Sequence, residues 1–188
     1  MYTLLLVDDE EDVIEVIERK VSWEQIGFHV VGHAGNGFKA LEMMEDMQPD
    51  VVMTDIRMPY MDGLELCSNI RQRFPATKLL LFTGFDDFEY AKEAVHLEIE
   101  EYILKPLNLA EITEVFKKLK TKLDDELNEK KNTDILKQYY AASLPVLQSN
   151  FYTTLIEGRI PENELGRYMR DYKIVLEGPY YCCIIIHT

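Results

Sequence analysis

The first 110 residues alternate short apolar runs, rich in Val, Ile and Leu, with longer stretches in which apolar residues recur every three or four positions. Five of the short runs have the length and composition of buried strands: Thr3–Val7, His29–Gly32, Val51–Thr54, Lys78–Phe82 and Tyr102–Leu104. Strands that alternate with amphipathic helices form a parallel sheet covered by helices on both faces. With right-handed crossovers, this pattern predicts an α/β fold, a flavodoxin-like, doubly wound, five-stranded parallel sheet in the order 2-1-3-4-5.

A further helical stretch begins at Leu109. Its apolar residues form one stripe: Ile112, Phe116, Leu119 and Leu123. This spacing predicts a helix with one face on the sheet, and the absence of Pro and Gly between Leu107 and Ser143 lets the helix continue beyond it. A second copy of the chain could cover such a helix in a coiled coil. That register would place Glu126 and Lys130 in the seam, which disfavours it.

The chain beyond this helix has the pattern of a second, different region. The segment Ser143–Pro145 indicates a break, because proline removes a helical hydrogen bond. Two short helices, 145–157 and 161–172, and a β-rich run, 180–186, should follow, and an apolar strand so near Thr188 leads us to expect a continuation. The expected parts are a first domain at 1–122, a helical linker at 123–142 and the start of a truncated α+β region at 143–188.

Charge and composition exclude several classes of protein. The net charge of −14 argues against binding nucleic acid through a basic surface of this chain. Residues 1–110 hold 9 Lys/Arg against 22 Asp/Glu, whereas residues 111–188 hold 11 against 12, so the two regions should do different jobs. No apolar stretch approaches the roughly 18 residues of a membrane span, and no signal peptide is recognisable. Three cysteines without metal-binding spacing favour a reducing, cytoplasmic location.

Polar residues directly follow four of the five predicted strands. They are Asp8 and Asp9, Asp55, Thr83, and Lys105. Ligands of open α/β sheets bind outside the carboxyl ends of the strands, so these side chains should converge at one edge. Taken singly, each has an ordinary explanation: an aspartate or threonine could cap a helix or form a turn, and the lysine could be a solvated surface residue. Their joint position favours a functional site.

Three carboxylates that lie close together repel one another and need a compensating charge. Mg²⁺ fits this need, because it binds one or two carboxylates, keeps several waters and contacts phosphate oxygens. Lys105 adds a positive charge suited to a phosphoryl oxygen, and Thr83 can donate a hydrogen bond to the same group. Since a carboxylate can accept a phosphoryl group covalently, the constellation predicts a site that places a phosphoryl group on one Asp.

Four segments resemble the receiver domain of two-component response regulators: LLLVDDEEDV, VVMTDIRMPYMDGLEL, LLLFTGFDDFEYAKEA and EYILKPL. The resemblance covers residues 1–122. It implies that Asp55 is the phosphoacceptor. It also implies that Asp9, Asp55 and the backbone carbonyl of Arg57 hold Mg²⁺, with Asp8 assisting mainly through water.

The same resemblance implies further roles. Thr83 and Tyr102 would form a switch pair, and Lys105 would contact the phosphoryl group. The peptide bond between Lys105 and Pro106 would be cis, which X–Pro bonds allow at small cost. The sequence departs from the family at Glu98, where members usually carry Gly, consistent with a left-handed residue after a helix.

Two later segments, NFYTTLIEGRIPENEL and LEGPYY, together with FTGFDDFEYAKEA, resemble response regulators whose output is an AraC-type helix-turn-helix domain. This resemblance implies a sensor histidine kinase as partner and a homodimer on phosphorylation. It also implies control of transcription through a C-terminal DNA-binding domain, for which this chain shows no helix-turn-helix pattern. No contact with a membrane is expected.

Two alternatives stay open. The receiver could serve a different output, a nucleotide cyclase-like or ligand-binding domain whose first strand would be 180–186. An aspartyl-phosphate phosphatase of the haloacid dehalogenase type is less favoured, because that chemistry needs a second acid two residues after the nucleophile, where this chain has Arg57. We therefore expect a phosphoacceptor that promotes its own phosphorylation and dephosphorylation rather than an enzyme with turnover.

Overall fold

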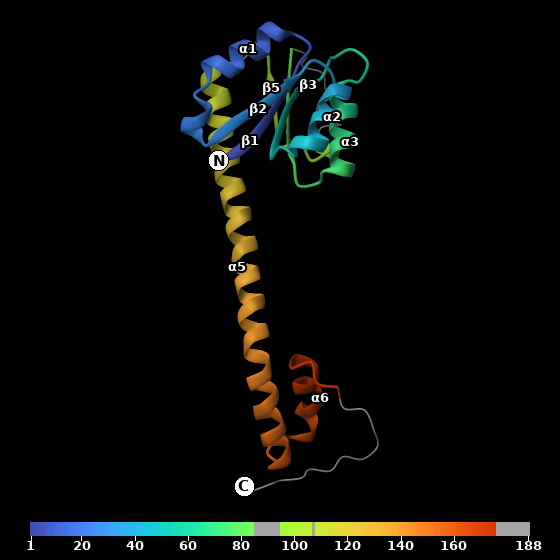
Figure 1. Cartoon of the computed structure of the whole chain (residues 1–188), viewed down its shortest axis with the longest axis vertical. Coiled ribbons are helices and arrows are strands. Elements are labelled where there is room, and N and C mark those ends of the chain that lie inside the picture. The colour runs from blue at the N-terminus through green and yellow to red at the C-terminus, as the bar shows by residue number, and fades with distance from the viewer. Residues whose placement is uncertain (85–94, 107, 176–188) are drawn as a thin grey trace. The chain divides into compact units, whose positions relative to one another are not determined.

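The computed structural model describes residues 1–84, 95–106 and 108–175. Most of the expected helix around Phe88–Val95, and the expected strand 180–186, lie outside the described residues. Contacts divide the chain into two compact units, a first unit, Met1–Asp125, and a second unit, Glu126–Thr188 (Figure 1). In the described part of the chain, no helix is both long enough and apolar enough to cross a membrane.

The first unit is built on a parallel sheet of five strands. They are β1 (Tyr2–Val7), β2 (Phe28–Ala34), β3 (Val51–Asp55), β4 (Lys78–Thr83) and β5 (Glu101–Leu104). Their order, β2-β1-β3-β4-β5, confirms the predicted doubly wound topology. Each predicted strand lies within the observed one, so the apolar runs located the sheet to within about two residues.

Helices cover both faces of this sheet. Those described before the last strand are α1 (Glu11–Lys20), the short 3₁₀ helix η1 (Trp23–Ile26), α2 (Gly37–Met47) and α3 (Gly63–Arg73). Alternate residues of β1 serve the two layers: Leu4 and Leu6 pack in the cluster with α1, and Leu5 and Val7 in the cluster with α2 and α3. Figure 1 shows α2 and α3 together on one face. Burial on both faces explains why the inner strands β1, β3 and β4 have continuous apolar runs rather than an alternating pattern.

Helix α5 (Leu109–Ile156) begins in the first unit and covers the same face as α1. All four residues of the predicted stripe are buried there: Ile112, Phe116, Leu119 and Leu123. Phe116 meets the rings of Trp23 and Phe28 edge-on, with centroids 4.7 and 5.0 Å apart. The prediction that this stripe packs on the sheet is therefore confirmed.

The predicted break at Ser143–Pro145 is wrong, because α5 continues through Pro145 to Ile156. Pro145 has no N–H, so the carbonyl of Ala141 loses its helical partner. Ala141 is exposed to solvent, which lets water hydrate that carbonyl, and the Ser143 hydroxyl donates to the Tyr139 carbonyl at 2.7 Å. The proline lies in an exposed part of the helix, where the lost hydrogen bond is cheapest to replace.

The second unit contains the later part of α5 and helix α6 (Glu162–Asp171), close to the predicted 161–172. Helix α5 ends at Ile156, and Gly158 follows with a φ of +67°. The N–H of Gly158 donates to the Leu155 carbonyl, and the N–H of Arg159 donates to the Thr154 carbonyl, each at 3.0 Å. These two hydrogen bonds form the Schellman motif. Phe151 is buried near the rings of Tyr168 and Tyr172.

Candidate functional site

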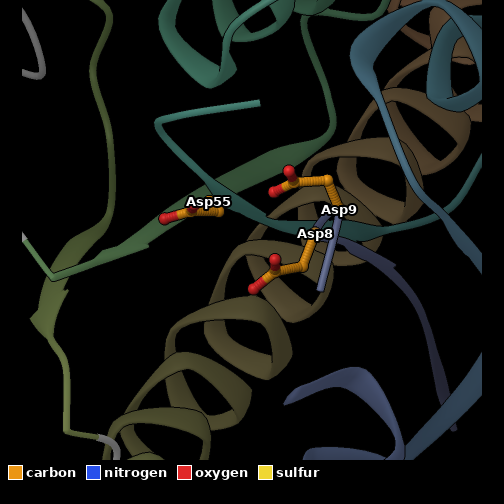
Figure 2. A group of neighbouring side chains, drawn as sticks. All are labelled: Asp8, Asp9 and Asp55. Carbon is orange, nitrogen blue, oxygen red and sulfur yellow. The ribbon is translucent and has the colours of Figure 1, made fainter. Parts of the chain in front are cut away.

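The predicted site residues meet at the carboxyl edge of the sheet. The register places Val7 beside Thr54 and Asp55 beside Phe82, so the strand ends are level. Carboxylate oxygens of Asp8, Asp9 and Asp55 lie within 4.8 Å of one another. Figure 2 shows the three side chains extending toward the same side of this edge. The sheet topology therefore brings together residues that are up to 47 positions apart in the chain.

Asp8 is fully buried, and both of its carboxylate oxygens have partners. Oδ1 accepts a hydrogen bond from the Glu10 backbone N–H at 2.8 Å, and Oδ2 accepts one from Lys105 Nζ at 3.0 Å. The N-cap position of α1 is occupied by Glu10, so capping does not account for Asp8 or Asp9. Burial raises the pKa of the Asp8 carboxyl above its ordinary value, against the opposing effects of these two hydrogen bonds.

Asp55 is the second buried carboxylate of the site. Its side chain is only 8% exposed, and Lys105 Nζ lies 3.6 Å from Oδ1. Among the described residues, this Oδ1 is the buried side-chain atom without a hydrogen-bond partner. Burial raises the pKa of the Asp55 carboxyl to about 6; Lys105 lowers it, and the charge of Asp8 raises it further.

Lys105 is the cation among these acids. Its ammonium contacts three carboxylates, those of Asp8, Asp55 and Glu10, and lies 5.0 Å from the centre of the Phe82 ring. Burial alone would lower the pKa of this amine, but the hydrogen bond to Asp8 and the negative charges around it raise the pKa above its ordinary value. Lys105 therefore stays protonated at neutral pH, and its ammonium group can contact both the carboxylates and an incoming anion.

The loop after β3 fixes the backbone of Asp55. The Gly63 N–H donates to the Ile56 carbonyl at 2.8 Å, and a Cβ on Gly63 would lie 2.0 Å from the Asp55 carbonyl oxygen, so only glycine fits. Asp62 then caps α3 by accepting from the Glu65 N–H at 2.8 Å. Arg57 lies exposed in this loop.

The other residues implied by the resemblance lie near the same edge. Thr83 is buried at the end of β4, and its carbonyl accepts from the Lys105 N–H at 2.7 Å. Tyr102 is half-buried on β5 and packs against the α2–α3 side of the core. The Lys105–Pro106 peptide bond is cis. Glu98 adopts a φ of +52°, the left-handed region in which glycine is usual.

The donor set fits a hard divalent cation. All three clustered groups are carboxylates, which are the ligands that Mg²⁺ prefers, and the unpartnered Asp55 Oδ1 offers a buried lone pair that no protein donor in the described chain satisfies. Asp9, which is exposed, leaves one side of the cluster open to solvent. The acidic cluster could therefore hold a metal ion.

Sequence reasoning missed Glu10 as a neighbour of the site. Its Oε1 lies 3.7 Å from Lys105 Nζ, although its side chain is largely exposed. The one available signal was its position directly after the Asp8–Asp9 pair, which does not say whether the side chain turns toward the edge or away from it.

The model of the response regulator receiver domain family matches residues 4–117 of the chain. The chain belongs to this family. The receiver domain corresponds to the first unit, which we therefore call the receiver unit. Receiver domains are components of two-component signalling systems, so the chain is part of a response regulator.

Individual proteins agree with this assignment. YesN of Bacillus subtilis, named an uncharacterized transcriptional regulatory protein, is 37% identical over 137 residues, 73% of this chain and 37% of YesN. The transcriptional regulatory protein HptR of Staphylococcus aureus is 26% identical over 164 residues, 87% of this chain and 64% of HptR. This chain thus spans less than two thirds of either relative.

Among solved structures, the receiver domain of AraT, a response regulator from Geobacillus stearothermophilus, superimposes with a TM-score of 0.64 and 36% identity. The match covers 67% of this chain and 98% of the AraT domain. Both the fold and the family of the receiver unit are thereby shown.

Proposed function

We propose that the receiver unit accepts a phosphoryl group on Asp55 from a sensor histidine kinase. The observation that carries this proposal is the Asp55 carboxylate itself. It is buried, its Oδ1 accepts no hydrogen bond from the residues that the structure describes, and this oxygen lies 3.6 Å from Lys105 Nζ. With a pKa of about 6, most of this carboxyl is ionised at neutral pH, and within the described part of the chain its Oδ1 lacks the donor that a structural carboxylate would have. Such a group is suited to nucleophilic attack.

In the proposed step, an Asp55 oxygen attacks the phosphorus of a phosphohistidine. The new O–P bond forms as the P–N bond breaks, and the electron pair of the P–N bond returns to the imidazole nitrogen of the donor. Lys105 shares its charge with a phosphoryl oxygen and relinquishes part of its contact with the carboxylates. Mg²⁺, held by Asp9, Asp55 and the Arg57 carbonyl with Asp8 nearby, would neutralise charge on the transferred group.

The added phosphoryl group would then change the conformation of the receiver unit. It carries about −1.5 to −2 charge at neutral pH and offers acceptor oxygens. Thr83, which is buried at the end of β4, would donate to such an oxygen, and its movement would open space for Tyr102 on the neighbouring strand β5. This exchange would alter the surface around β5 and the start of α5, and so favour a homodimer.

The output we propose is control of transcription by the longer protein. Its support is that YesN and HptR are named transcriptional regulatory proteins, and that they extend well beyond the length matched here. The acidic chain itself, with its net charge of −14, is unsuited to bind DNA. DNA binding would then belong to a C-terminal domain of the AraC type, brought to paired sites by dimerisation.

Labelling with acetyl phosphate tests the phosphoacceptor directly. We expect Mg²⁺-dependent phosphorylation of the unaltered chain, measured by mass spectrometry of the intact protein, and complete loss of label in Asp55→Asn. Asp46→Asn, an exposed aspartate on α2, is the matched control and should label normally. Persistent label on Asp55→Asn would move the acceptor to another residue and overturn the proposal.

A further inference from the structure

The loop between β3 and α3 contains a strained residue with no evident role in the fold. Tyr60 has a φ of +72°, and the N–H of Met61 donates to the carbonyl of Pro59 at 2.9 Å, which closes a three-residue turn around it. Turns of this kind with a positive central φ are rare and strained, because the Cβ of an L-residue crowds the backbone there.

The turn is needed by the backbone, but the tyrosine side chain is not. The turn brings Met61 into the core, where its side chain covers Gly37, and leaves Asp62 in place to cap α3. Glycine at position 60 would make the same turn without the steric cost. A bulky residue at a position that favours glycine therefore indicates a role for the ring outside the fold.

The ring itself faces solvent. Tyr60 is 86% exposed, the highest value among the large apolar side chains of the described residues. It lies five residues after Asp55, in the loop that leaves the carboxyl edge of the sheet. A second exposed aromatic side chain, Phe38, follows Gly37 at the start of α2, and so belongs to the same edge.

The charge around the site limits how a phosphoryl donor can bind. Asp9, Glu10 and Asp62 are exposed acids near this edge, and they repel an anionic phosphoryl group as it approaches. Electrostatic attraction to the transferred group is therefore a poor source of affinity for the donor. An aromatic ring that contacts the donor's apolar surface avoids this repulsion, and aromatic residues often dominate interface affinity.

We propose that Tyr60 is a docking residue for the protein that carries the phosphohistidine, a contact that distinguishes a protein donor from a small-molecule donor. This inference rests on the proposed function, because it assumes that Asp55 is the acceptor. The ring packs against the apolar side chains that flank the donor histidine, next to the acceptor. Tyr60 takes no part in the bond-forming step and should not affect the chemistry at Asp55.

The test compares two donors with the same P–N bond. Phosphoramidate presents that bond without a protein surface, and the histidine-phosphorylated dimerisation domain of a sensor kinase that labels the unaltered chain presents it with one. We expect Tyr60→Gly to keep its rate of labelling by phosphoramidate and to lose about tenfold or more in kcat/KM for transfer from the kinase domain. The melting temperature of this variant should be equal or higher, since the strain is relieved.

Two further variants test whether the loss of the ring or the relief of backbone strain causes the slower transfer from the kinase domain. Tyr60→Phe keeps the ring and should restore transfer from the kinase domain, whereas Gln48→Gly relieves left-handed strain at the end of α2 and should leave both donors unchanged. Kinase transfer to Tyr60→Gly at the unaltered rate, or an equal loss with both donors, would overturn the inference. Failure of the unaltered chain to label at all would instead refute the proposed function.

Discussion

The receiver unit and the second unit differ in how they bury their apolar residues. In the receiver unit, helices cover both faces of the sheet. Leu4 and Leu5, which are neighbours in the chain, are therefore both fully buried, one in each layer. In the described part of the second unit, the buried apolar side chains are Phe151 and Ile174, while Leu136 and Tyr139 on α5 are largely exposed. A helix without tertiary packing is marginal in water, so the stability of this chain resides mainly in the receiver unit.

Replacing a buried phenylalanine should lower the free energy of unfolding most, and only in the unit that contains it. Phe116→Ala should lower the free energy of unfolding of the receiver unit by about 3–5 kcal/mol, because the ring is fully buried between Trp23 and Phe28. Urea unfolding followed by Trp23 fluorescence measures this loss. Phe151→Ala, a buried phenylalanine of the second unit, is the matched control and should leave that transition in place. An equal shift from both variants would show that the two units unfold together, which would contradict the expected difference between them.

A smaller effect concerns the acidic site, which among the described residues lies in the receiver unit. The Asp55 carboxyl has a pKa of about 6 in the fold and about 3.9 when unfolded, so its charged form is disfavoured by folding. In metal-free protein, ionisation of Asp55 should therefore lower the free energy of unfolding as the pH rises from about 4 to about 6, by at most about 3 kcal/mol. Asp55→Asn should remove most of this loss and be the more stable protein at pH 7.

Urea unfolding in chelator at several pH values tests this sign. Mg²⁺ should stabilise the unaltered chain at pH 7 and have little effect on Asp55→Asn, because a ligand stabilises only the state that binds it. Asp46→Asn, exposed on α2, should keep both the pH dependence and the response to Mg²⁺. A metal-free Asp55→Asn that is less stable than the unaltered chain at pH 7 would contradict the expected cost of this charge.

Relief of backbone strain should change the stability of the protein least. Glu98 and Lys173 both have left-handed φ values, +52° and +53°, one in each unit. Glu98→Gly should raise the stability of the receiver unit by about 1 kcal/mol or less, because the strain is partly offset by the greater freedom of glycine in the unfolded chain. Lys173→Gly should leave the receiver transition unchanged. Differential scanning calorimetry resolves shifts of this size, and a destabilised Glu98→Gly would refute the strain argument.

The sheet and most of the site could be predicted because they depend on local patterns. A buried parallel strand needs a continuous apolar run, and the residue that ends such a run must lie at the carboxyl edge. Asp8, Asp55 and Lys105 were therefore placed by their position after the runs, and the structure brings them within contact distance. Their chemistry as an acceptor site remains a prediction.

The errors and omissions have a common origin in the surroundings of each residue. Pro145 normally breaks a helix, but here the lost hydrogen bond belongs to a solvent-exposed carbonyl, and exposure is not visible in the sequence. Glu10 lies beside Lys105 only because the chain turns at the start of α1. The strain at Tyr60 depends on a backbone angle that the letters of the loop do not specify.

Hydrophobic periodicity and chain connectivity were enough to predict the strand order and the edge at which the acids collect, because both act along the chain. Three properties depended on the tertiary structure: no group of the described residues donates to Asp55 Oδ1, Lys105 contacts three carboxylates, and Tyr60 lies exposed on a strained turn. Each of these depends on distances between residues remote in the chain, or on the surface that remains after packing, and is settled only when the whole core has formed.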